Sequence, residues 1–595
     1  MSTIPRPQPL YLETTPDPTF VTYHPAAASK VRDTSVMLCP PFGFDEVSSY
    51  RSLRTWAMRL AADGYPVLRL SFPGTGDSGG DPRDPDRLGT WASAAHAGAT
   101  FLKRNSGCAR VAAIGIGLGA IVVRLAVGDG APIDDLVMWG APARGSSFLR
   151  QLRAFSKLER SLFYENLPDP PAPPEGEIEA GGFVLSAQTV QALGALDLTQ
   201  LPLPAWPRRR VLLLERDGLA VDRDLRAHFE EAEVELLVAP GEGYAAMTSD
   251  PQAAVEPEGV IQYVGGWLGE SAALVAGRSS ELEDPVDGAT STADLSPGLT
   301  SVTETPLYIS RPSADLAGVL VEPAQRPAHG LCLVLLNAGA VRRIGPDRMW
   351  VQAARGWAQR GVPTLRLDVE GIGDAGGDGR PYRDDAALYV PGLVPQVIAA
   401  LDDLQKRGLG DRFIVGGLCA GAYWSFHAAL IDPRVQAALM LNPRALVWDT
   451  GLEPARDLRV LLHERPSLSK IRRVATAARL RALARWLFSS PLRWLRAPIA
   501  QRPAPLINDE VKRLLDRLLA SEKRALILFS DHEPLQRELA DSGQLARLQS
   551  SPNMTVEYVA VHDHTLRPGW AQRQALAALD RTVERELTAD GALTA

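Results

Sequence analysis

The stretch FIVGGLCAGA, residues 413–422, places one thiol between an apolar run and a helical pattern. The apolar residues before Cys419 predict a buried strand, and the spacing of apolar residues from Tyr423 to Leu430 predicts a helix directly after it. Glycines stand two residues before and two residues after the cysteine. Side chains at Gly417 and Gly421 would collide with the strand and the helix if the chain turned sharply at Cys419. The stretch therefore predicts a strand, a strained turn that exposes a thiol, and a helix.

The same order of elements occurs twice in the chain. The residues LRL followed by GxGD occupy positions 68–77 in the first half and 365–374 in the second, an offset of 297 residues. Matched spacing of this kind marks an internal repeat. Ser186 and Asn508 stand at corresponding positions as predicted helix N-caps. Because strands and helices alternate in both halves, the sequence predicts an α/β protein with two mostly parallel sheets, each covered by helices on both faces.

Length and composition place the chain among multidomain globular proteins. Its 595 residues exceed what one core accommodates. Apolar residues at 45% and charged residues at 22% are ordinary for this class, and a net charge of −7 gives no general attraction to nucleic acid. The N-terminus lacks the basic and apolar regions of a signal peptide. No apolar run approaches the ~20 residues of a membrane helix, so no stable membrane insertion is expected.

The four cysteines are scattered and form no CxxC pair or other metal-ligand spacing: Cys39, Cys108, Cys332 and Cys419. Such usage favours reduced thiols in a cytosol. We therefore expect a cytoplasmic protein without a metal site, and the sequence indicates no cofactor.

Composition also suggests where the halves begin and end. We predict one domain over residues 1–270, a linker rich in Ser, Thr, Gly and Asp over 271–303, and a second domain over 304–590. Inserts are expected at about 144–207 and 444–507, where each half departs from the shared order of strands and helices. The first insert contains a Pro-rich loop at 168–174.

The strand, Gly-x-Cys-x-Gly turn and helix resemble the nucleophile elbow of the α/β-hydrolase superfamily. The resemblance covers nearly the whole chain as two tandem copies. A cysteine at the elbow is similar to dienelactone hydrolases and polyhydroxyalkanoate synthases. The resemblance implies that both inserts are helical caps over an active site.

The resemblance also implies a catalytic triad in the order nucleophile, acid, base. Asp531 directly follows the predicted strand 526–529, and His564 follows the last predicted strand. A thiol at neutral pH is mostly protonated and needs such a base, which in turn needs an orienting carboxylate. We therefore expect Cys419 as nucleophile, His564 as general base and acid, and Asp531 as the group that orients the imidazole.

Four nearby residues are alternatives to this assignment. His562 could replace His564 as the base, and Asp563 could replace Asp531. His532 is expected at the surface or beside the site, and His427 is expected to pack within the helix after the elbow.

An oxyanion hole needs backbone N–H groups aimed at developing negative charge. One is expected from Ala420, immediately after the nucleophile. The other is expected from the turn after the first core strand of the second half, at Ala338 or Gly339; a plain bend is the alternative for that turn.

The first half lacks this chemistry at the matching positions. Gly117 occupies the elbow, although Asp217 still stands in the acid position. The position of the base falls on Glu242 or Tyr244, and the histidines of this half lie elsewhere, at His24, His96 and His228. We expect a non-catalytic half that serves as a structural or docking partner.

The second insert is strongly basic, with 12 Arg and one Lys against four acidic residues, a net charge of +9. Its amphipathic pattern predicts a basic helix. This helix is a candidate binding site for an anionic carrier, either coenzyme A phosphates or an acidic acyl carrier protein. A solvated cap face and a membrane-surface helix are the alternatives. The basic side chains concerned are Arg472, Arg473, Arg479, Arg481 and Arg485.

Together these patterns favour an enzyme of acyl transfer. A cysteine that takes an acyl group as a thioester can pass it to an amine, thiol or carbon nucleophile. Hydrolysis of a thioester, ester or lactone is the nearest alternative. A second alternative is a non-catalytic binding module in which Cys419 is an inert buried thiol. The oligomeric state stays open, a homodimer included.

Overall fold

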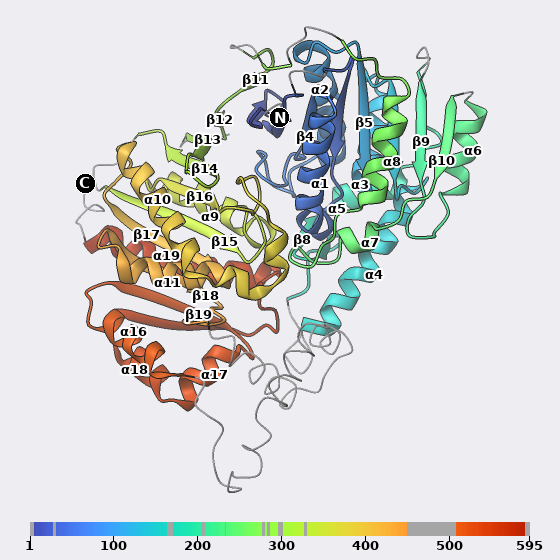
Figure 1. Ribbon diagram of the computed structural model, residues 1–595. Helices are drawn as coiled ribbons and strands as arrows, with labels where there is room; N and C mark the ends of the chain where they lie inside the picture. Colours follow the sequence, from blue (N-terminus) through green and yellow to red (C-terminus); the bar gives the residue numbers. More distant parts are fainter. Residues whose placement is uncertain are drawn as a thin grey trace, which may run out of the picture.

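The computed structural model shows two bodies of mixed helix and strand, coloured blue to green and yellow to red in Figure 1. The residues that it describes are 5–27, 31–163, 171–204, 209–232, 234–275, 280–282, 286–295, 301–325, 330–448 and 507–589.

The first half builds a nine-stranded sheet in the spatial order β10-β9-β6-β5-β3-β4-β2-β1-β11. Six neighbouring strands, from β10 to β4, are parallel, and the remaining three are antiparallel. The strands are β1 (Gln8–Leu12), β2 (Thr19–His24), β3 (Thr34–Cys39), β4 (Val67–Leu70), β5 (Arg110–Ile116), β6 (Asp135–Trp139), β9 (Arg210–Leu214), β10 (Glu235–Ala239) and β11 (Ala289–Thr290). The helices are α1 (Phe44–Ala62), α2 (Arg87–Asn105), α3 (Leu118–Gly128), α4 (Gly145–Phe163), α5 (Ala187–Ala195), α6 (Arg223–Glu231), α7 (Tyr244–Met247) and α8 (Glu258–Gly269).

The second half repeats this arrangement in a second nine-stranded sheet, in the order β12-β13-β14-β16-β15-β17-β18-β19-β20. Its strands are β12 (Ala293–Asp294), β13 (Val302–Ile309), β14 (Leu316–Pro323), β15 (Leu331–Ala338), β16 (Thr364–Asp368), β17 (Arg412–Leu418), β18 (Val435–Leu441), β19 (Arg524–Ser530) and β20 (Met554–Val559). Its helices are α9 (Met349–Gln359), α10 (Val394–Lys406), α11 (Ala420–Ile431), α16 (Asp509–Leu519), α17 (Pro534–Asp541), α18 (Gln544–Ser550) and α19 (Gly569–Ala589), with short 3-10 turns η1 (Pro346–Arg348), η2 (Arg380–Arg383), η3 (Asp385–Leu388) and η4 (Pro391–Leu393).

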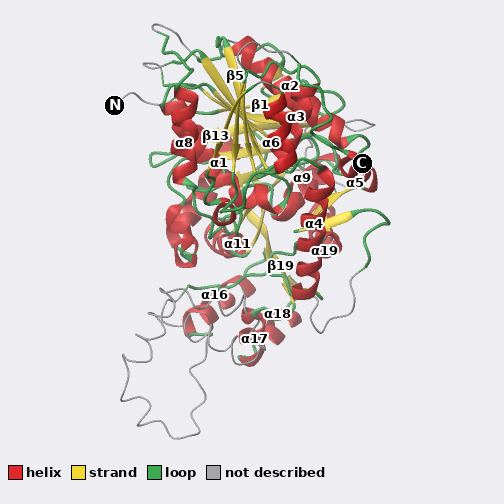
Figure 2. Cartoon of the chain, turned by 90° about the vertical axis from the view of Figure 1, so that its right-hand side faces the viewer, coloured by secondary structure: helices red, strands yellow, loops and turns green. Residues whose placement is uncertain are grey.

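Helices cover both faces of each sheet, as Figure 2 shows from the side. The central strands are apolar on both faces because each face is buried. Val334 and Leu336 of β15 pack in one core with α10 and α11, whereas Leu333 and Leu335 pack in another with α9 and α19. The period of two residues in a strand divides the apolar side chains between these two cores.

The two predicted N-caps are confirmed. The Ser186 side chain accepts a hydrogen bond from the Thr189 N–H at the start of α5. The Asn508 side chain accepts one from the Val511 N–H at the start of α16, at 2.9 Å. Each satisfies a backbone donor that the first turn of a helix leaves unpaired.

The stretch predicted as a linker contributes to both sheets. β11 pairs antiparallel with β1 at the edge of the first sheet, and β12 pairs antiparallel with β13 at the edge of the second. The chain therefore passes from one half to the other through two short edge strands, one in each sheet.

The two inserts differ in what can be described. The described part of the first insert consists of α4, the hairpin β7 (Ile178–Ala180) and β8 (Phe183–Leu185), and α5. Its hairpin reaches the second half, where the Glu179 carboxylate accepts a hydrogen bond from the Gly569 N–H at 2.7 Å. The predicted second insert lies outside the described residues except for 444–448 and 507. Within the described part of the chain, no helix has the length and apolar character needed to cross a membrane.

The two halves meet through charged side chains at matched positions. Arg69 of β4 forms an ion pair with Asp374, and Arg366 of β16 forms an ion pair with Asp77. The two arginines are 297 positions apart, and so are the two aspartates. The contact is therefore reciprocal, as in the isologous interface of a two-fold dimer. Arg343 lies between the pairs, 2.9 Å from a carboxylate oxygen of Asp77 and 2.9 Å from one of Asp374.

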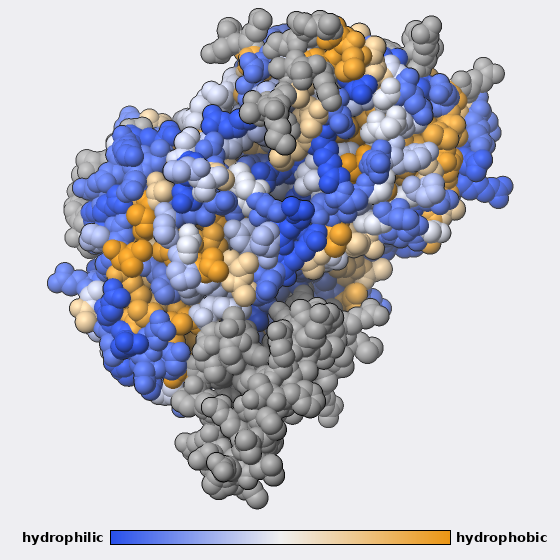
Figure 3. All heavy atoms as spheres, viewed as in Figure 1, coloured by the Kyte–Doolittle hydropathy of each residue, from blue (hydrophilic) through white to orange (hydrophobic). Residues whose placement is uncertain are grey.

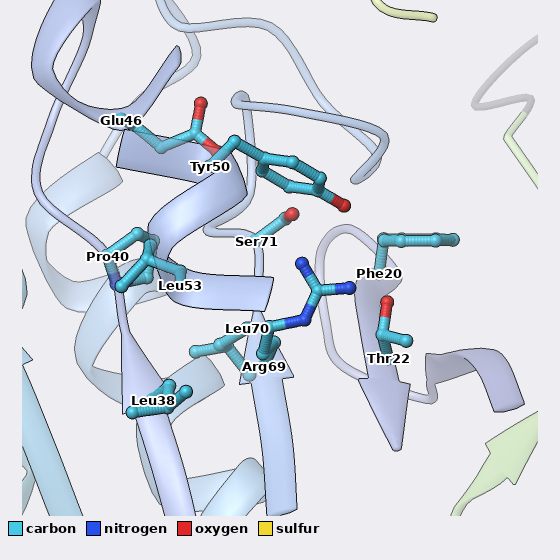
Figure 4. A pocket seen from close by; sticks show the side chains of 10 residues that line it. All are labelled: Phe20, Thr22, Leu38, Pro40, Glu46, Tyr50, Leu53, Arg69, Leu70 and Ser71. Atoms are coloured by element: carbon cyan, nitrogen blue, oxygen red, sulfur yellow. The ribbon is translucent and has the colours of Figure 1, made fainter. Parts of the chain in front are cut away.

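Figure 4 shows the side of this contact that the first half provides, around a small cavity of about 10 Å³. The Arg69 guanidinium points toward the Tyr50 ring, with 4.9 Å between the guanidinium carbon and the ring centroid. Glu46 lies one turn before Tyr50 on α1. On the surface, a hydrophilic band runs between the two halves (Figure 3).

Candidate functional site

Cys419 lies at the sharp turn between β17 and α11, as the sequence predicts. Its φ of 58° and ψ of −112° place a non-glycine residue in a strained region of backbone space. A Cβ on Gly417 would come within 2.4 Å of the Gly421 backbone, and one on Gly421 within 2.3 Å of the Asn337 carbonyl oxygen. Both glycines are therefore required by close backbone approach, and the turn presents a partly exposed thiol.

His564 lies in the loop after β20 and is held by a carboxylate. Its Nδ1 is 2.9 Å from Oε1 of Glu533. The same oxygen accepts a hydrogen bond from the Ser530 hydroxyl at 3.0 Å. This contact leaves Nε2 of the imidazole for the thiol, and Nε2 is buried without a hydrogen bond of standard geometry to the described residues.

The carboxylate on His564 belongs to Glu533 and not to Asp531, so the expected pairing is wrong in that residue. β19 continues to Ser530, one residue beyond the predicted strand. His532 then adopts a left-handed conformation with φ of 65°, which reverses the chain before α17. Glu533, the N-cap residue of α17, is thereby buried under the end of the strand, whereas Asp531 is partly exposed.

The thiol and the imidazole favour each other's charged forms. Burial raises the pKa of Cys419, but the charge of His564 and a hydrogen bond from Tyr389 outweigh it, so the pKa of the thiol is lowered. Burial lowers the pKa of His564, but Glu533 and the thiolate outweigh it, and the imidazole pKa lies well above its usual value. The arrangement favours a thiolate–imidazolium pair.

Two of the buried cysteines, Cys39 and Cys332, differ from Cys419 in this respect. Burial raises the pKa of Cys39 and that of Cys332, and in the described part of the chain no charged group offsets it in either case as His564 does at Cys419. The electrostatic setting therefore separates Cys419 from these two thiols.

Tyr389 is a member of the site that the sequence does not reveal. Its hydroxyl is 3.2 Å from the Cys419 sulfur. Its ring stacks on Trp448, with centroids 4.2 Å apart, and packs edge-on against Tyr423. Burial and the neighbouring thiolate raise the pKa of Tyr389, so it stays a protonated donor to the sulfur. Tyr389 follows η3 in a region without a regular helix or strand, where no periodic pattern marks it.

Asn442 ties the loops of the site together at the end of β18. Its side-chain oxygen accepts a hydrogen bond from the Ser530 N–H, and its side-chain nitrogen donates to the His564 carbonyl, both at 2.7 Å. Asn442 has φ of 43°, a left-handed conformation that asparagine tolerates better than most residues. The end of β19, which leads to Glu533, and the loop that carries His564 are therefore fixed to each other.

Arg444 adds a positive charge to the surroundings of the thiol. It forms an ion pair with Asp385 of η3, and its guanidinium carbon is 5.4 Å from the centroid of the Trp448 ring. It contributes to the lowered pKa of Cys419, after the larger effects of burial, His564 and Tyr389.

The residues expected to supply the oxyanion donors lie next to the end of β17. Ala420 is the first residue of α11, where backbone N–H groups have no partner within the helix. Ala338 ends β15 opposite Leu418, the residue before the thiol, and Gly339 follows with φ of 58°. The role of these backbone N–H groups in binding an oxyanion stays a prediction.

The alternative residues occupy other surroundings. His562 packs against the ring of His532, with centroids 4.3 Å apart. Asp563 forms an ion pair with Arg567 at 3.0 Å. His427 is packed within α11, where its Nε2 is 2.9 Å from the Leu446 carbonyl oxygen, as expected.

The five arginines of the predicted basic helix, Arg472, Arg473, Arg479, Arg481 and Arg485, lie outside the described residues. Their role as a carrier-binding site stays a prediction. Among the described residues no cluster of His, Cys, Asp and Glu could hold a metal ion.

In the first half, a tyrosine occupies the place where a nucleophile and base would meet. Gly117 has φ of 55° and ψ of −117°, and a Cβ placed on it would lie 2.8 Å from the Tyr244 hydroxyl. Asp217 accepts hydrogen bonds from the backbone N–H groups of Gly243, Tyr244 and Ala245. Of the two residues expected opposite His564, Tyr244 is buried at this position and Glu242 is exposed.

A family model and several solved structures resemble this chain. Residues 36–258 match the alpha/beta hydrolase family. A search of curated proteins finds no match. Similar solved structures include Est1E from Butyrivibrio proteoclasticus, at 16% identity over 44% of this chain and 98% of that chain, with a TM-score of 0.31. They also include alpha/beta hydrolase domain-containing protein 10 from mouse, at 17% identity over 47% and 99%, with a TM-score of 0.30. A dienelactone hydrolase from Anabaena variabilis is similar at 15% identity over 48% and 96%, with a TM-score of 0.29.

These likenesses concern the fold alone. The sheet order and the family match over residues 36–258 show an α/β-hydrolase fold, and the chain forms two nine-stranded sheets with the same order of strands. The chemistry of this chain has to be argued from its own side chains.

Proposed function

We propose that the protein is a cysteine-dependent acyltransferase in which the second half carries out the reaction and the first half is a non-catalytic copy. The observation that carries the proposal is the arrangement at the elbow: a partly exposed thiol, favoured as thiolate by His564, whose imidazole is braced by Glu533. An inert buried cysteine requires none of these neighbours.

The first chemical step joins the acyl group to the enzyme. The Cys419 thiolate attacks the carbonyl carbon of an acyl thioester, and the backbone N–H groups of Ala420 and of the turn at Ala338 or Gly339 receive the negative charge on oxygen. The carbonyl re-forms as the bond to the donor sulfur breaks. The imidazolium of His564 gives its proton to the departing thiolate. The products are an acyl-enzyme and a free thiol.

The second step passes the acyl group on. His564, now neutral, removes the proton from an amine or thiol acceptor as that group attacks the acyl carbon. Sulfur of Cys419 leaves as the thiolate and is stabilised again by the imidazolium and by the Tyr389 hydroxyl. No metal or external oxidant is needed for either step. The donor is proposed to be bound to coenzyme A or to an acyl carrier protein, in keeping with the net charge of +9 in residues 444–507.

Intact-protein mass spectrometry tests this proposal directly. Wild-type protein is incubated with acyl-CoA donors of short, medium and long chain, and the adduct is located by peptide mapping. We expect an acyl group on Cys419, absent in Cys419→Ala and retained in Cys108→Ala, which removes a buried thiol of the first half. An amine or thiol acceptor should clear the adduct faster than water does.

Two other outcomes would replace the proposal. An adduct that water clears as fast as the acceptors do identifies a hydrolase acting on thioesters, esters or lactones. Absence of any adduct or turnover with thioester and ester donors, in protein whose Cys419 is shown to be intact, favours the non-catalytic binding module.

A further inference from the structure

The turn that carries the second oxyanion donor projects out of its own half and into the first. The Val341 N–H donates to the Ala338 carbonyl at 3.1 Å and closes the turn around Gly339. The next two residues, Arg342 and Arg343, are buried. The Arg342 side chain contacts Glu46 of the first half, and the Arg343 side chain contacts Asp77 of the first half as well as Asp368 and Asp374 of its own. This turn therefore lies at the boundary of the two halves.

Glu46 of α1 receives the first of these side chains. Nη1 of Arg342 lies 2.8 Å from Oε1 of Glu46 and 3.0 Å from Oε2. The Arg342 guanidinium also lies over the Tyr50 ring, with its carbon 4.0 Å from the ring centroid. One nitrogen of Arg342, Nη1, therefore contacts both carboxylate oxygens, whereas Nε and Nη2 are buried without a hydrogen-bond partner among the described residues. The charge-assisted contact and the aromatic face together limit where this side chain can lie.

The base of the turn is held by its own half. Asp368 at the end of β16 accepts hydrogen bonds from the Arg343 N–H at 2.6 Å and from the Asn337 side chain at 2.8 Å. The Asn337 side chain also donates to the Val341 carbonyl at 3.0 Å. Within the described residues, the turn is thus fixed at its base by the second half and, through the Arg342 and Arg343 side chains, by Glu46 and Asp77 of the first half.

Gln252 of the first half lies beside the turn itself. Its Oε1 is 4.0 Å from the position that a Cβ on Gly339 would occupy. Its Nε2 donates to the Asp385 carboxylate at 2.5 Å, the same carboxylate that pairs with Arg444. A side chain of the first half therefore lies between the turn of the predicted oxyanion donor and the segment that leads to Tyr389.

We propose that the first half is a positioning module for acylation: Glu46, through Arg342, and Gln252, beside Gly339, hold the oxyanion turn in the geometry that receives a negatively charged oxygen. This inference rests on the proposed acyl transfer. Neither side chain touches the reacting atoms, so both are positioning residues. Such placement matters because a displacement of about 1 Å in a catalytic group costs as much as ~10²-fold in rate.

Two reactions of Cys419, acylation and alkylation, distinguish a loss of oxyanion positioning from a loss of reactivity of the thiol itself. Acylation by a thioester develops charge on a carbonyl oxygen and needs the oxyanion donors. Alkylation by iodoacetamide displaces iodide, develops no charge at that position, and reports only on the thiolate. The measured quantity is the ratio of the acylation rate constant to the alkylation rate constant, each obtained in a single turnover.

The variants are Glu46→Gln, which keeps the shape of the side chain but removes its charge, and Gln252→Ala. The matched control is Gln262→Ala, an exposed glutamine on α8 of the same half. We expect the ratio to fall roughly 10-fold in Glu46→Gln and about 3-fold in Gln252→Ala, within the effect of losing part of one oxyanion donor. The control should match the wild type. Thermal unfolding of each variant shows whether it is folded, and Gln252→Ala serves if the buried Glu46→Gln is not.

An unchanged ratio in the folded variants would overturn the inference while leaving acyl transfer intact. Equal losses in the two rate constants also leave the ratio unchanged and would overturn the inference. They would mean that Glu46 and Gln252 affect the reactivity of the thiol and not the oxyanion turn. If the wild-type protein is alkylated at Cys419 but never acylated, the proposed function fails first and this inference falls with it.

Discussion

The two elbows of this chain have nearly the same backbone conformation but differ in the side chain at the turn, which is a thiol in the second half and absent in the first. Gly117 has φ of 55° and ψ of −117°, and Cys419 has φ of 58° and ψ of −112°. In the second half the turn presents a thiol to an imidazole. In the first half it presents no side chain, and the Tyr244 hydroxyl fills the space. A strained turn is therefore kept by the packing of strand and helix, and the chemistry depends on what stands at its tip.

The carboxylates of the two halves differ in a similar way. The carboxylate oxygens of Asp217 accept hydrogen bonds from three backbone N–H groups at the start of α7. Glu533 instead reaches the His564 ring and is held by the hydroxyl of Ser530. A carboxylate follows this strand in both halves. Asp217 holds the start of a helix, whereas the carboxylate that contacts His564 comes from Glu533, two residues beyond Asp531, the residue matched to Asp217.

The largest effect is expected from Cys419→Gly, which gives the second elbow the residue found at the first and tests whether the thiol is the nucleophile. We expect loss of acyl transfer by at least ~10⁴-fold, because no other group on the turn can form the thioester. The glycine should fit, since the site already has a positive φ. Product formation and thermal unfolding are measured together; wild-type turnover in a folded variant would contradict the assignment of the nucleophile.

The next variant tests which carboxylate orients the base. Glu533→Gln should lower the acylation rate by roughly 10²–10⁴-fold, the range seen when an imidazole loses its orienting carboxylate. Because that carboxylate also raises the pKa of His564, less imidazolium remains to stabilise the thiolate. The pH midpoint of Cys419 alkylation should therefore move upward.

Asp531→Asn is the matched control for this experiment, since it makes the same chemical change two residues away. We expect rates close to those of the wild type. The reverse result, a large loss in Asp531→Asn and little in Glu533→Gln, would restore the assignment made from sequence.

Tyr389→Phe should have a smaller effect that depends on pH. Its hydroxyl donates to the sulfur and lowers the pKa of Cys419, so its removal should raise that pKa by about one unit, the equivalent of ~1.4 kcal/mol for a hydrogen bond to a charged group. Below the midpoint, alkylation should slow about tenfold, and well above it the rates should converge. A rate profile of identical midpoint would show that the hydroxyl does not stabilise the thiolate.

The smallest expected effect concerns the first elbow. Gly117→Cys places a side chain where the Tyr244 hydroxyl lies, at a φ that favours glycine, and should lower the free energy of unfolding by about 1–3 kcal/mol. We expect no acylation of the new thiol, because Tyr244 stands where the second half has its imidazole. Denaturant unfolding and peptide mapping measure the two effects; rapid acylation of the thiol introduced at position 117 would show that the first half still supports the reaction.

Much of the fold follows from sequence because its signals are local. The strand before Cys419, the two flanking glycines and the repeated Arg and Asp positions are each contained in a short stretch, and the structure has them as expected. Cys419 and His564 likewise follow the ends of strands, β17 and β20.

The residues that the sequence did not reveal depend on the path of irregular segments. Glu533 replaces Asp531 at the imidazole because one left-handed residue, His532, reverses the chain, and its φ of 65° has no sequence signature. Tyr389 and Gln252 come from irregular segments, and the segment before Tyr389 contacts the first half through the hydrogen bond from Gln252 to Asp385. Only tertiary packing brings Glu533 to the imidazole, Tyr389 to the thiol and Gln252 to the turn at Gly339.

The reciprocal ion pairs between the halves have a consequence for how one copy could lose its nucleophile. A surface on which Arg69 meets Asp374 and Arg366 meets Asp77 is self-complementary, so a lone domain with both residues could bind a twin of itself through it. When the two domains are joined in one chain, each holds the other at a high effective concentration. The tethered twin then contributes by its shape and charge alone, and selection on its own thiol is relaxed without loss of the assembly.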